Sequence, residues 1–297
     1  MRDDAFRDKV AMVTGGSSGI GRALALGLAR RGARLVLASH QAADLAAVAR
    51  ECEALGAQAA AVPTDVTDEA QCRSLVERTV AECGRIDALF NNAGWGVYGR
   101  LEDLPDLAAF RKVIETNLMG SVSVTYYALA HLKASRGRIV ATSSLAGKMG
   151  FPNATSYSAS KFAVAGFFDA LRVELMGSGV SVTVAYPGLV ASPFHEHSHL
   201  ADGTPTGKAG YRVYSRRTMT PEACAERILK AAARRRRHVL MTLSGRLGIW
   251  MNFLFPSVQD RVQAWIGREH ARRLGDASRD RNAKGSPENI GHKDARR

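Results

Sequence analysis

The stretch that decides the fold is KVAMVTGGSSGIGRALALGLARR, residues 9–31. A short apolar run over residues 9–14 ends in a glycine-rich turn, and helical periodicity follows over residues 20–31. Glycines at such a turn let a pyrophosphate approach the backbone N–H groups of a helix N-terminus. The glycines that begin at Gly15 are spaced GxxxGxG, which differs from the more common GxGxxG pattern. We expect a dinucleotide-binding turn, and the alternative is a plain connection between strand and helix.

Short apolar runs and longer helical stretches continue to alternate along the chain. Strands are expected at residues 34–39, 58–62, 86–90, 138–142 and 180–185. Helices are expected from residue 40 to near residue 56 and at residues 67–83, 107–132, 157–176 and 221–233. Such alternation is typical of βαβ units, which build a buried parallel sheet with right-handed crossovers. The sequence therefore predicts one α/β domain, a doubly wound sandwich with ligands at the carboxyl ends of its strands.

Charge is distributed unevenly along the 297 residues, which carry a net charge of +13. Residues 1–207 hold 20 basic and 20 acidic side chains, whereas residues 208–297 hold 21 basic and 8 acidic ones. A basic C-terminal third suggests an anionic partner, either a membrane or a nucleic acid, and the alternative is a solvated basic face.

The cysteines and the apolar segments indicate the compartment. The four cysteines show neither CxxC pairing nor the spacing of metal ligands; they are Cys52, Cys72, Cys83 and Cys224. Buried thiols of this kind are typical of a reducing compartment. The first ten residues lack the apolar core of a signal peptide, and no long uncharged stretch resembles a membrane span. We expect a cytoplasmic protein.

A second informative stretch, SSLAGKMGFPNATSYSASK, spans residues 143–161. In a helix, the four-residue spacing of Tyr157 and Lys161 places both side chains on one face. An ammonium beside a phenol favours the phenolate and lowers its pKa from about 10, as a general acid–base catalyst needs. Tyrosine and lysine are also common on helix surfaces, so this pair carries weight only together with other motifs.

Those motifs occur in a fixed order: TGGSSGIG at 14–21, NNAG at 91–94, Asn117, Ser144, YxxxK at 157–161 and PG at 187–188. Together they resemble the short-chain dehydrogenase/reductase family in its compact single-domain form, over about residues 8–242. The resemblance implies a Rossmann-like fold with a seven-stranded parallel sheet, residues 238–242 as its last strand, and a nicotinamide cofactor.

The resemblance also implies catalytic roles. Tyr157 would be the general acid–base, and Lys161 would lower its pKa and hold the nicotinamide ribose. Ser144, thirteen residues before the tyrosine, would position the substrate oxygen. Asn117 would hold a water of the proton relay. The implied reaction moves a hydride between the nicotinamide and a carbonyl or secondary alcohol.

Cofactor contacts are expected at the strand ends and the turns that follow them. The predicted residues are Gly15, Ser17, Ser18, Gly19, Ile20, Gly21, Ser39, His40, Asp65, Val66, Asn91, Ala93, Gly94, Tyr157, Lys161, Pro187, Gly188, Val190 and Ser192. At the end of the second strand, an acidic residue would bind the adenosine ribose and favour NAD. Ser39 and His40 stand there instead, so a 2′-phosphate meets no carboxylate and His40 can donate to it. We expect NADP(H) rather than NAD(H).

Residues 189–220 show no clear periodicity, and the family places a substrate lid there. The apolar residues expected around the substrate are Trp95, Val97, Met149, Phe151, Phe194, Leu200, Tyr211, Val213 and Tyr214. They indicate a hydrophobic carbonyl or alcohol that is lipid-, steroid- or retinoid-like. His195, His197 and His199 could suggest a metal, but the resemblance implies none.

Residues 243–267 form an apolar extension, which Pro256 and Asp260 interrupt. Tryptophans beside Arg246 and Arg261 are typical of a segment at a membrane surface. A dimer contact and a flap over the active site are the alternatives. The polar tail over residues 268–297 lacks periodicity and is expected to be disordered.

The remaining predictions concern partners. Arg234–Arg237 follow an expected helix, where cations complement the helix dipole, so we expect no nucleic acid. The family resemblance implies a homodimer or homotetramer. A non-catalytic regulatory or scaffold protein that binds the cofactor on the same fold is the alternative to an enzyme.

Overall fold

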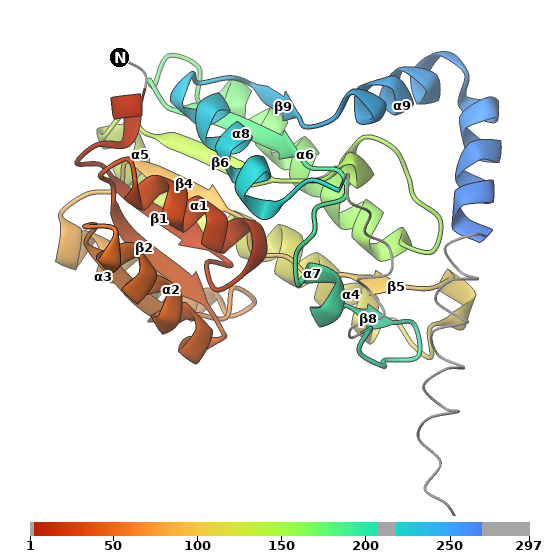
Figure 1. Ribbon diagram of the computed structural model, residues 1–297, viewed down its shortest axis with the longest axis horizontal. Coiled ribbons are helices and arrows are strands. Elements are labelled where there is room, and N and C mark those ends of the chain that lie inside the picture. The colour runs from red at the N-terminus through yellow and green to blue at the C-terminus, as the bar shows by residue number, and fades with distance from the viewer. Residues whose placement is uncertain (1–2, 207–217, 269–297) are drawn as a thin grey trace, which may run out of the picture.

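Seven strands form one parallel sheet through the centre of the protein (Figure 1). The computed structural model describes residues 3–206 and 218–268. The strand order is β3-β2-β1-β4-β6-β7-β9. The strands are β1 Val10–Thr14, β2 Arg34–Ser39, β3 Ala59–Pro63, β4 Ala88–Asn91, β6 Arg138–Thr142, β7 Ser181–Tyr186 and β9 His238–Leu240. The predicted doubly wound, Rossmann-like sheet of seven parallel strands is confirmed.

The chain enters the sheet in the middle and reverses direction once. It runs from β1 through β2 to β3 at one edge, and then returns to β4 on the other side of β1. The adjacent strands β1 and β4 are in register, with Val13 opposite Phe90. In open parallel sheets, the crevice at such a reversal is where ligands bind. The carboxyl ends of β1 and β4 therefore mark the expected site.

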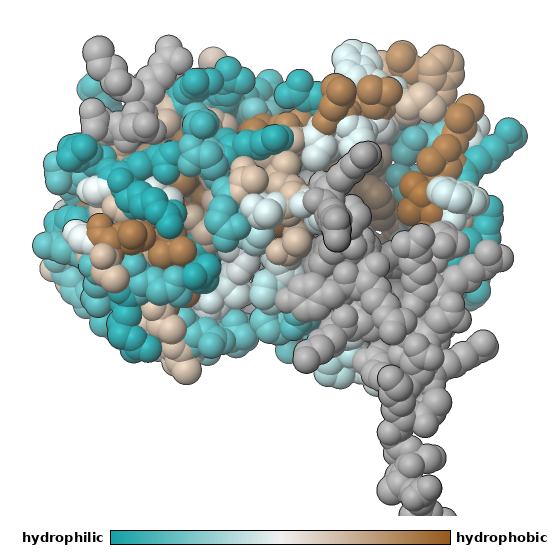
Figure 2. All heavy atoms as spheres, viewed as in Figure 1, coloured by the Kyte–Doolittle hydropathy of each residue, from teal (hydrophilic) through white to brown (hydrophobic). Residues whose placement is uncertain are grey.

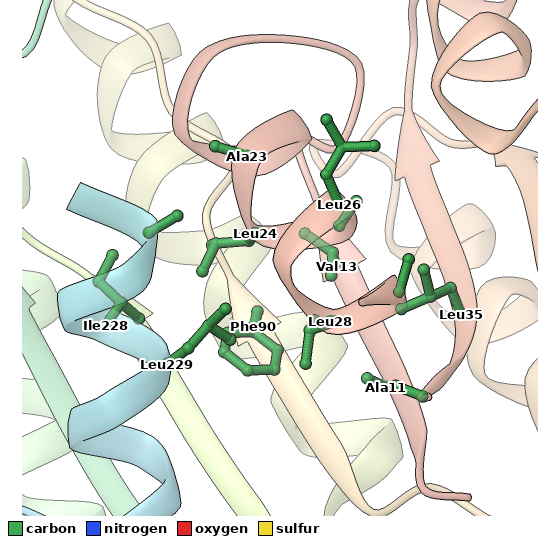
Figure 3. Close-up of a cluster of buried hydrophobic side chains, with 14 of the residues drawn as sticks. Ala11, Val13, Ala23, Leu24, Leu26, Leu28, Leu35, Phe90, Ile228 and Leu229 are labelled. Carbon is green, nitrogen blue, oxygen red and sulfur yellow. The ribbon is translucent and has the colours of Figure 1, made fainter. Parts of the chain in front are cut away.

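Three helices cover one face of the sheet: α1 Gly19–Ala29, α2 Ala42–Ala54 and α8 Pro221–Ala233. Figure 3 shows Leu24 and Leu28 of α1 over the sheet, with Phe90 between them and Leu229 of α8. Gly27 lets α1 and α8 pack closely, because a Cβ there would lie 2.6 Å from Leu229 Cδ1. This contact fixes the helix that begins at the glycine-rich turn.

The opposite face is covered by α3 Glu69–Cys83, α5 Gly120–Ala134 and α6 Thr155–Glu174, with α4 Ala108–Ile114 beside them. The sequence predicted a single helix over residues 107–132. Instead, one π-helical turn, Glu115–Met119, lies between α4 and α5. A π turn holds an extra residue and so rotates the side chains that follow, and such turns are frequent at functional sites. Here it contains the buried Asn117.

A small second layer lies at the carboxyl ends of the strands. Strand β5 Val97–Tyr98 pairs in parallel with β8 His199–Leu200, which follows the short α7 Phe194–His197. The ends of the predicted lid are joined, because Ala191 N donates to Met219 O over 2.9 Å. The rest of the predicted lid, residues 207–217 with Tyr211, Val213 and Tyr214, lies outside the described residues. So does the tail from residue 269, which the sequence predicted to be disordered.

The C-terminal extension consists of α9 Leu243–Leu254 and a second helix over residues 256–268 (Figure 1). Among the residues that the structure describes, no helix combines the length and the apolar character needed to cross a membrane.

The basic run before β9 has a structural role. Arg235 donates to the carbonyl oxygens of Gly179 at 2.6 Å and Arg136 at 2.7 Å. The sequence predicted a structural role through the dipole of α8. These hydrogen bonds instead tie the connection between α8 and β9 to the turns before β6 and β7.

Candidate active site

A cavity of about 700 Å³ opens at the carboxyl ends of the strands. Most of the residues that the sequence predicted for the site line it. They are Gly15, Ser17, Ser18, Gly19, Ile20, Ser39, His40, Asp65, Val66, Ala93, Gly94, Ser144, Tyr157, Lys161, Pro187, Gly188, Val190 and Ser192. The structure thus brings the predicted dinucleotide and catalytic residues to one continuous space.

Three predicted residues, Gly21, Asn91 and Asn117, do not line the cavity but support its walls. A Cβ on Gly21 would lie 1.9 Å from the carbonyl oxygen of Gly15, so only glycine fits under the turn. Asn91 Nδ2 donates to Thr125 Oγ1 over 2.8 Å and joins β4 to α5. These three residues therefore help to shape the site.

The glycine-rich turn and the end of β4 are joined by hydrogen bonds. Thr14 Oγ1 accepts from the backbone N–H groups of Asn92 at 3.0 Å and Ala93 at 3.1 Å. Gly15 has a φ of +64°, and a Cβ there would lie 2.9 Å from Ala93 Cα. Helix α1 begins at Gly19, so its free N–H groups and positive dipole end are directed at the cavity. This arrangement suits a pyrophosphate.

A polar cluster follows the end of β2. Ser17 Oγ lies 2.9 Å from Ser39 Oγ and donates to Gln41 Oε1 over 2.9 Å. The His40 side chain is exposed at the edge of the cavity. Sequence reasoning missed Gln41, although its position directly after Ser39 and His40 was a signal. The cluster contains hydroxyl, amide and imidazole groups and no carboxylate.

Tyr157 and Lys161 lie on one face of α6, as their spacing predicted. Lys161 is only 4% exposed, and its Nζ donates to the carbonyl oxygen of Thr142 over 2.9 Å. The same Nζ lies 5.6 Å from the centre of the Tyr157 ring. The buried lysine is therefore held between the end of β6 and the tyrosine.

Burial controls the pKa values of this pair. It raises the pKa of Tyr157 to about 12, although a hydrogen bond with Ser144 opposes the shift. Burial also lowers the pKa of Lys161 to about 8. The sequence predicted that Lys161 lowers the tyrosine pKa. The net shift in the structure is upward, because removing the phenolate from water outweighs the hydrogen bond with Ser144.

Asn117 connects three segments of the site. Its Oδ1 accepts from Trp95 N over 2.7 Å, and its Nδ2 donates to Trp95 O at 2.9 Å and to Ser160 Oγ at 2.8 Å. In the structure its side-chain amide fixes the backbone after Gly94 against α6, the helix that carries Tyr157. The role of Asn117 in holding a water of the proton relay stays a prediction.

Aromatic side chains surround Tyr157 on the substrate side. Phe194 lies with its ring centre 5.6 Å from that of Tyr157, and Tyr98 at 6.5 Å. Trp95 and Phe151 line the cavity as predicted.

The sequence also placed Val97, Met149 and Leu200 around the substrate, and for these the prediction was wrong. None of them lines the cavity, and Val97 and Met149 are buried. Ile266 and Gly267 do line it. The sequence offered a flap over the active site only as an alternative for residues 243–267, and no local pattern singled out these two residues.

The histidines near the cavity make packing contacts. His199 meets Trp95 edge-on at 5.2 Å, and the carbonyl oxygen of His197 accepts from Trp95 Nε1 over 3.1 Å. Within residues 3–206 and 218–268, no group of three or more His, Cys, Asp or Glu side chains could hold a metal ion.

Comparison with known proteins agrees with this geometry. The family model for short chain dehydrogenases matches residues 9–202. Over 258 residues the chain is 35% identical to 11-beta-hydroxysteroid dehydrogenase A of Sesamum indicum, covering 86% of this chain and 74% of that protein.

Two solved structures are similar to this one. A short chain dehydrogenase/reductase from Burkholderia phymatum in complex with NAD has a TM-score of 0.77 and 26% identity, covering 86% of this chain and 96% of its own. An alcohol dehydrogenase from the archaeon Thermococcus sibiricus complexed with 5-hydroxy-NADP has a TM-score of 0.68 and 25% identity, covering 79% and 97%. The chain belongs to the short-chain dehydrogenase/reductase family of oxidoreductases.

Proposed function

We propose that this protein uses NADP(H) to interconvert a carbonyl group and a secondary alcohol on a hydrophobic substrate. The observation that carries the proposal is the single cavity in which Ser144, Tyr157 and Lys161 meet the glycine-rich turn. A non-catalytic role as a cofactor-binding scaffold is the alternative. The complete set of catalytic side chains argues against it.

The residues present fit a nicotinamide dinucleotide. The glycines at positions 15 and 19 leave bare backbone at the N-terminus of α1. A Cβ on Gly94 would lie 3.3 Å from Lys161 Nζ and 3.4 Å from Asn117 Oδ1, so a side chain there would crowd both groups. When bound, a nicotinamide supplies or accepts the hydride.

The proton chemistry follows from the chain's own groups. With a pKa of about 12, Tyr157 is protonated at neutral pH and can donate to an oxygen that gains negative charge. Ser144 hydrogen-bonds to Tyr157, so both hydroxyls can meet one substrate oxygen and stabilise an alkoxide. With a pKa of about 8, Lys161 is mostly charged at neutral pH. Protonated Tyr157 is the form that carbonyl reduction requires, because the alkoxide takes up a proton.

The preference for NADP(H) rests on the polar cluster after β2. A 2′-phosphate there would meet Ser39, His40 and Gln41, and β2 ends without a carboxylate, because the Asp65 carboxylate of the same cavity follows β3. His40→Asp should lower kcat/KM with NADPH by about 100-fold through charge repulsion, while the value with NADH is kept or rises, because a carboxylate there can bind the adenosine ribose. Equal effects on the two cofactors in steady-state assays would remove the basis for this preference.

The hydrophobic substrate is supported by the aromatic wall around Tyr157. Trp95, Phe151 and Phe194 face the cavity, and the sesame relative is named a hydroxysteroid dehydrogenase. A steroid-like carbonyl is therefore a natural first candidate.

The direct test is a carbonyl panel that includes polycyclic and long-chain ketones, assayed with NADPH and with NADH. We expect NADPH oxidation with at least one large hydrophobic ketone. Tight NADPH binding without turnover of any member would favour the scaffold alternative.

We further propose a homo-oligomer in the cytoplasm. Apolar side chains are exposed along α5 and α6, including Tyr126, Phe162 and Val173, and a second copy could cover them. The four free thiols support a reducing compartment. Val173→Glu should dissociate the oligomer in sedimentation velocity measurements, and an unchanged sedimentation coefficient would exclude this interface.

We also propose that the extension contacts an anionic membrane surface. Figure 2 shows apolar surface gathered over α9 and the helix that follows it. Trp250 and Phe253 are 64% and 76% exposed, and Arg246 and Arg261 lie beside this surface with exposed side chains.

Vesicles containing phosphatidylserine test the membrane contact. The full chain should pellet with them, and Phe253→Glu should pellet several-fold less. The control is Leu101→Glu, which changes an exposed apolar residue outside the extension. Equal pelleting of both variants would exclude the contact.

A further inference from the structure

The extension packs against the loop that joins Ser144 to Tyr157. Three glycines mark the contact points. A Cβ would lie 2.8 Å from Leu145 Cδ1 at Gly245, 3.2 Å from Met149 Cε at Gly248, and 2.5 Å from Pro152 Cγ at Gly267. Glycine at each point allows a close approach, and a larger residue would displace the flexible ends of Leu145 and Met149 or press on the ring of Pro152. The extension and the loop are therefore fitted to one another along their length.

Polar contacts hold the helix of residues 256–268 in place. The buried Gln259 and Gln263 each direct Nε2 at Met149 Sδ, at 3.6 and 3.8 Å. Asn153 Nδ2 donates to the carbonyl oxygen of Gly267 over 3.1 Å. An ordinary surface helix buries its apolar side chains and exposes its polar ones. This helix does the opposite, because its glutamines are buried and Val258, Val262 and Trp265 are exposed. Its inner face is thus directed at the loop.

This contact reaches the catalytic residues. Asn153 has a φ of +60°, and its carbonyl oxygen accepts from Gly99 N over 2.8 Å. Asn153 lies four residues before Tyr157 and just before α6, which begins at Thr155. Among the described residues of the extension, Ile266 and Gly267 line the same cavity as Tyr157. The helix therefore contributes surface to the substrate end of the site.

We propose that the helix of residues 256–268 is a wall of the substrate compartment, in which Ile266 selects hydrophobic carbonyls by size. Gly267 acts as a positioning residue, because its close contact with Pro152 sets where the loop lies. This inference rests on the proposed function, since size selection requires a substrate that fills the cavity beyond Tyr157. The match to the family model ends at residue 202 and so does not include the wall.

Size selection is tested with Ile266→Ala in the full chain. The assay measures kcat and KM with NADPH, without lipid, for cyclic ketones from one ring to four. Removing the side chain enlarges the compartment and removes a contact with small substrates. We expect the ratio of kcat/KM for the largest to the smallest active ketone to rise about 10-fold, mainly through KM.

Val262→Ala is the matched control. It shortens a β-branched side chain of similar exposure on the same helix, and Val262 does not line the cavity. The ratio of kcat/KM for the largest to the smallest active ketone should stay within about two-fold of the wild-type value in Val262→Ala. An unchanged ratio in Ile266→Ala, or an equal change in both variants, would overturn the proposal.

A second measurement does not depend on turnover. Gly267→Ala places a methyl group against Pro152, so amide hydrogen exchange over residues 145–154 should become several-fold faster, with residues 10–21 unchanged. Ala264→Ser, at an exposed position of the same helix, should leave both segments at wild-type rates. Unchanged exchange of the loop in Gly267→Ala would refute the contact. If no ketone is turned over by the wild type, the proposed function fails, and this measurement still reports on the wall.

Discussion

The catalytic centre and the C-terminal extension border the same cavity but are built in opposite ways. Asn117 and Lys161 are 1% and 4% exposed and are held by hydrogen bonds from several segments. On the extension, Trp250 and Phe253 expose most of their apolar surface, and only the inner face is packed. Buried polar groups must be paired to be tolerated, so their geometry is fixed by the protein itself. The outer face of the extension is instead suited to contacts beyond the chain.

The largest expected effect lies at the catalytic centre. Tyr157→Phe removes the hydroxyl that donates the proton, so kcat should fall by about 1,000-fold, or about 4 kcal/mol of transition-state stabilisation. The ring and its packing remain, so the dissociation constant for NADPH should change less than about two-fold. Stopped-flow or steady-state NADPH oxidation measures kcat, and a fluorescence titration measures the dissociation constant for NADPH. Retained turnover would show that the centre does not depend on this hydroxyl.

Glycines provide the next comparison. A methyl group on Gly21 would lie 1.9 Å from a backbone oxygen, whereas one on Gly245 would lie 2.8 Å from flexible Leu145 methyl groups. Gly21→Ala should therefore lower the free energy of unfolding by about 3 kcal/mol or more. Gly245→Ala should change it by less than about 1 kcal/mol, because the gain in helix propensity offsets a small shift of Leu145. Urea denaturation of both variants measures the difference, and equal values would show that the two regions are equally rigid.

The buried lysine gives a pH-dependent prediction. The pKa of Lys161 falls from 10.5 to about 8 on folding, so between these values the unfolded chain binds the extra proton. Stability from this group is therefore lowest below pH 8 and increases as the pH rises toward 10.5. Relative to Lys161→Met, the wild type should gain about 2 kcal/mol of unfolding free energy across this window.

The wild type must be compared with Lys161→Met because other groups titrate in the same pH range. Burial raises the pKa of the Cys52 and Cys72 thiols to about 11, which lowers the stability of both proteins as the pH rises above 9. Urea titrations at pH 7.5, 9 and 10 isolate the lysine as the difference. A difference that is constant with pH would mean that Lys161 keeps its charge when buried.

The smallest effect is expected on the outer face of the extension. Trp250 is 64% exposed, so Trp250→Ala should change the free energy of unfolding by no more than about 0.5 kcal/mol. Phe90→Ala, at a fully buried aromatic residue of β4, should cost about 3–5 kcal/mol. Thermal and urea unfolding of Trp250→Ala and Phe90→Ala measure both changes. A large loss of unfolding free energy in Trp250→Ala would show that the tryptophan packs within the protein.

Much of the site was predictable because each motif is local. The turn between β1 and α1 needs glycines for reasons of backbone space, and Tyr157 and Lys161 share a helix face through their spacing alone. The π turn around Asn117 was not predictable, because a helix with one extra residue in a turn has the same composition and nearly the same periodicity. The direction of the Tyr157 pKa shift was also missed, since burial depends on what packs over the ring.

The sequence by itself determined the parallel sheet, its glycine-rich turn and the order of the catalytic residues, because these follow from periodicity and from backbone geometry over a few residues. Only the tertiary structure decided what closes the substrate end of the cavity. Asn153 and Gly267 are 114 residues apart, and their hydrogen bond places Ile266 and Gly267 beside the loop that leads to Tyr157. Such a contact depends on how two distant surfaces fit together, and no local pattern along the chain encodes that fit.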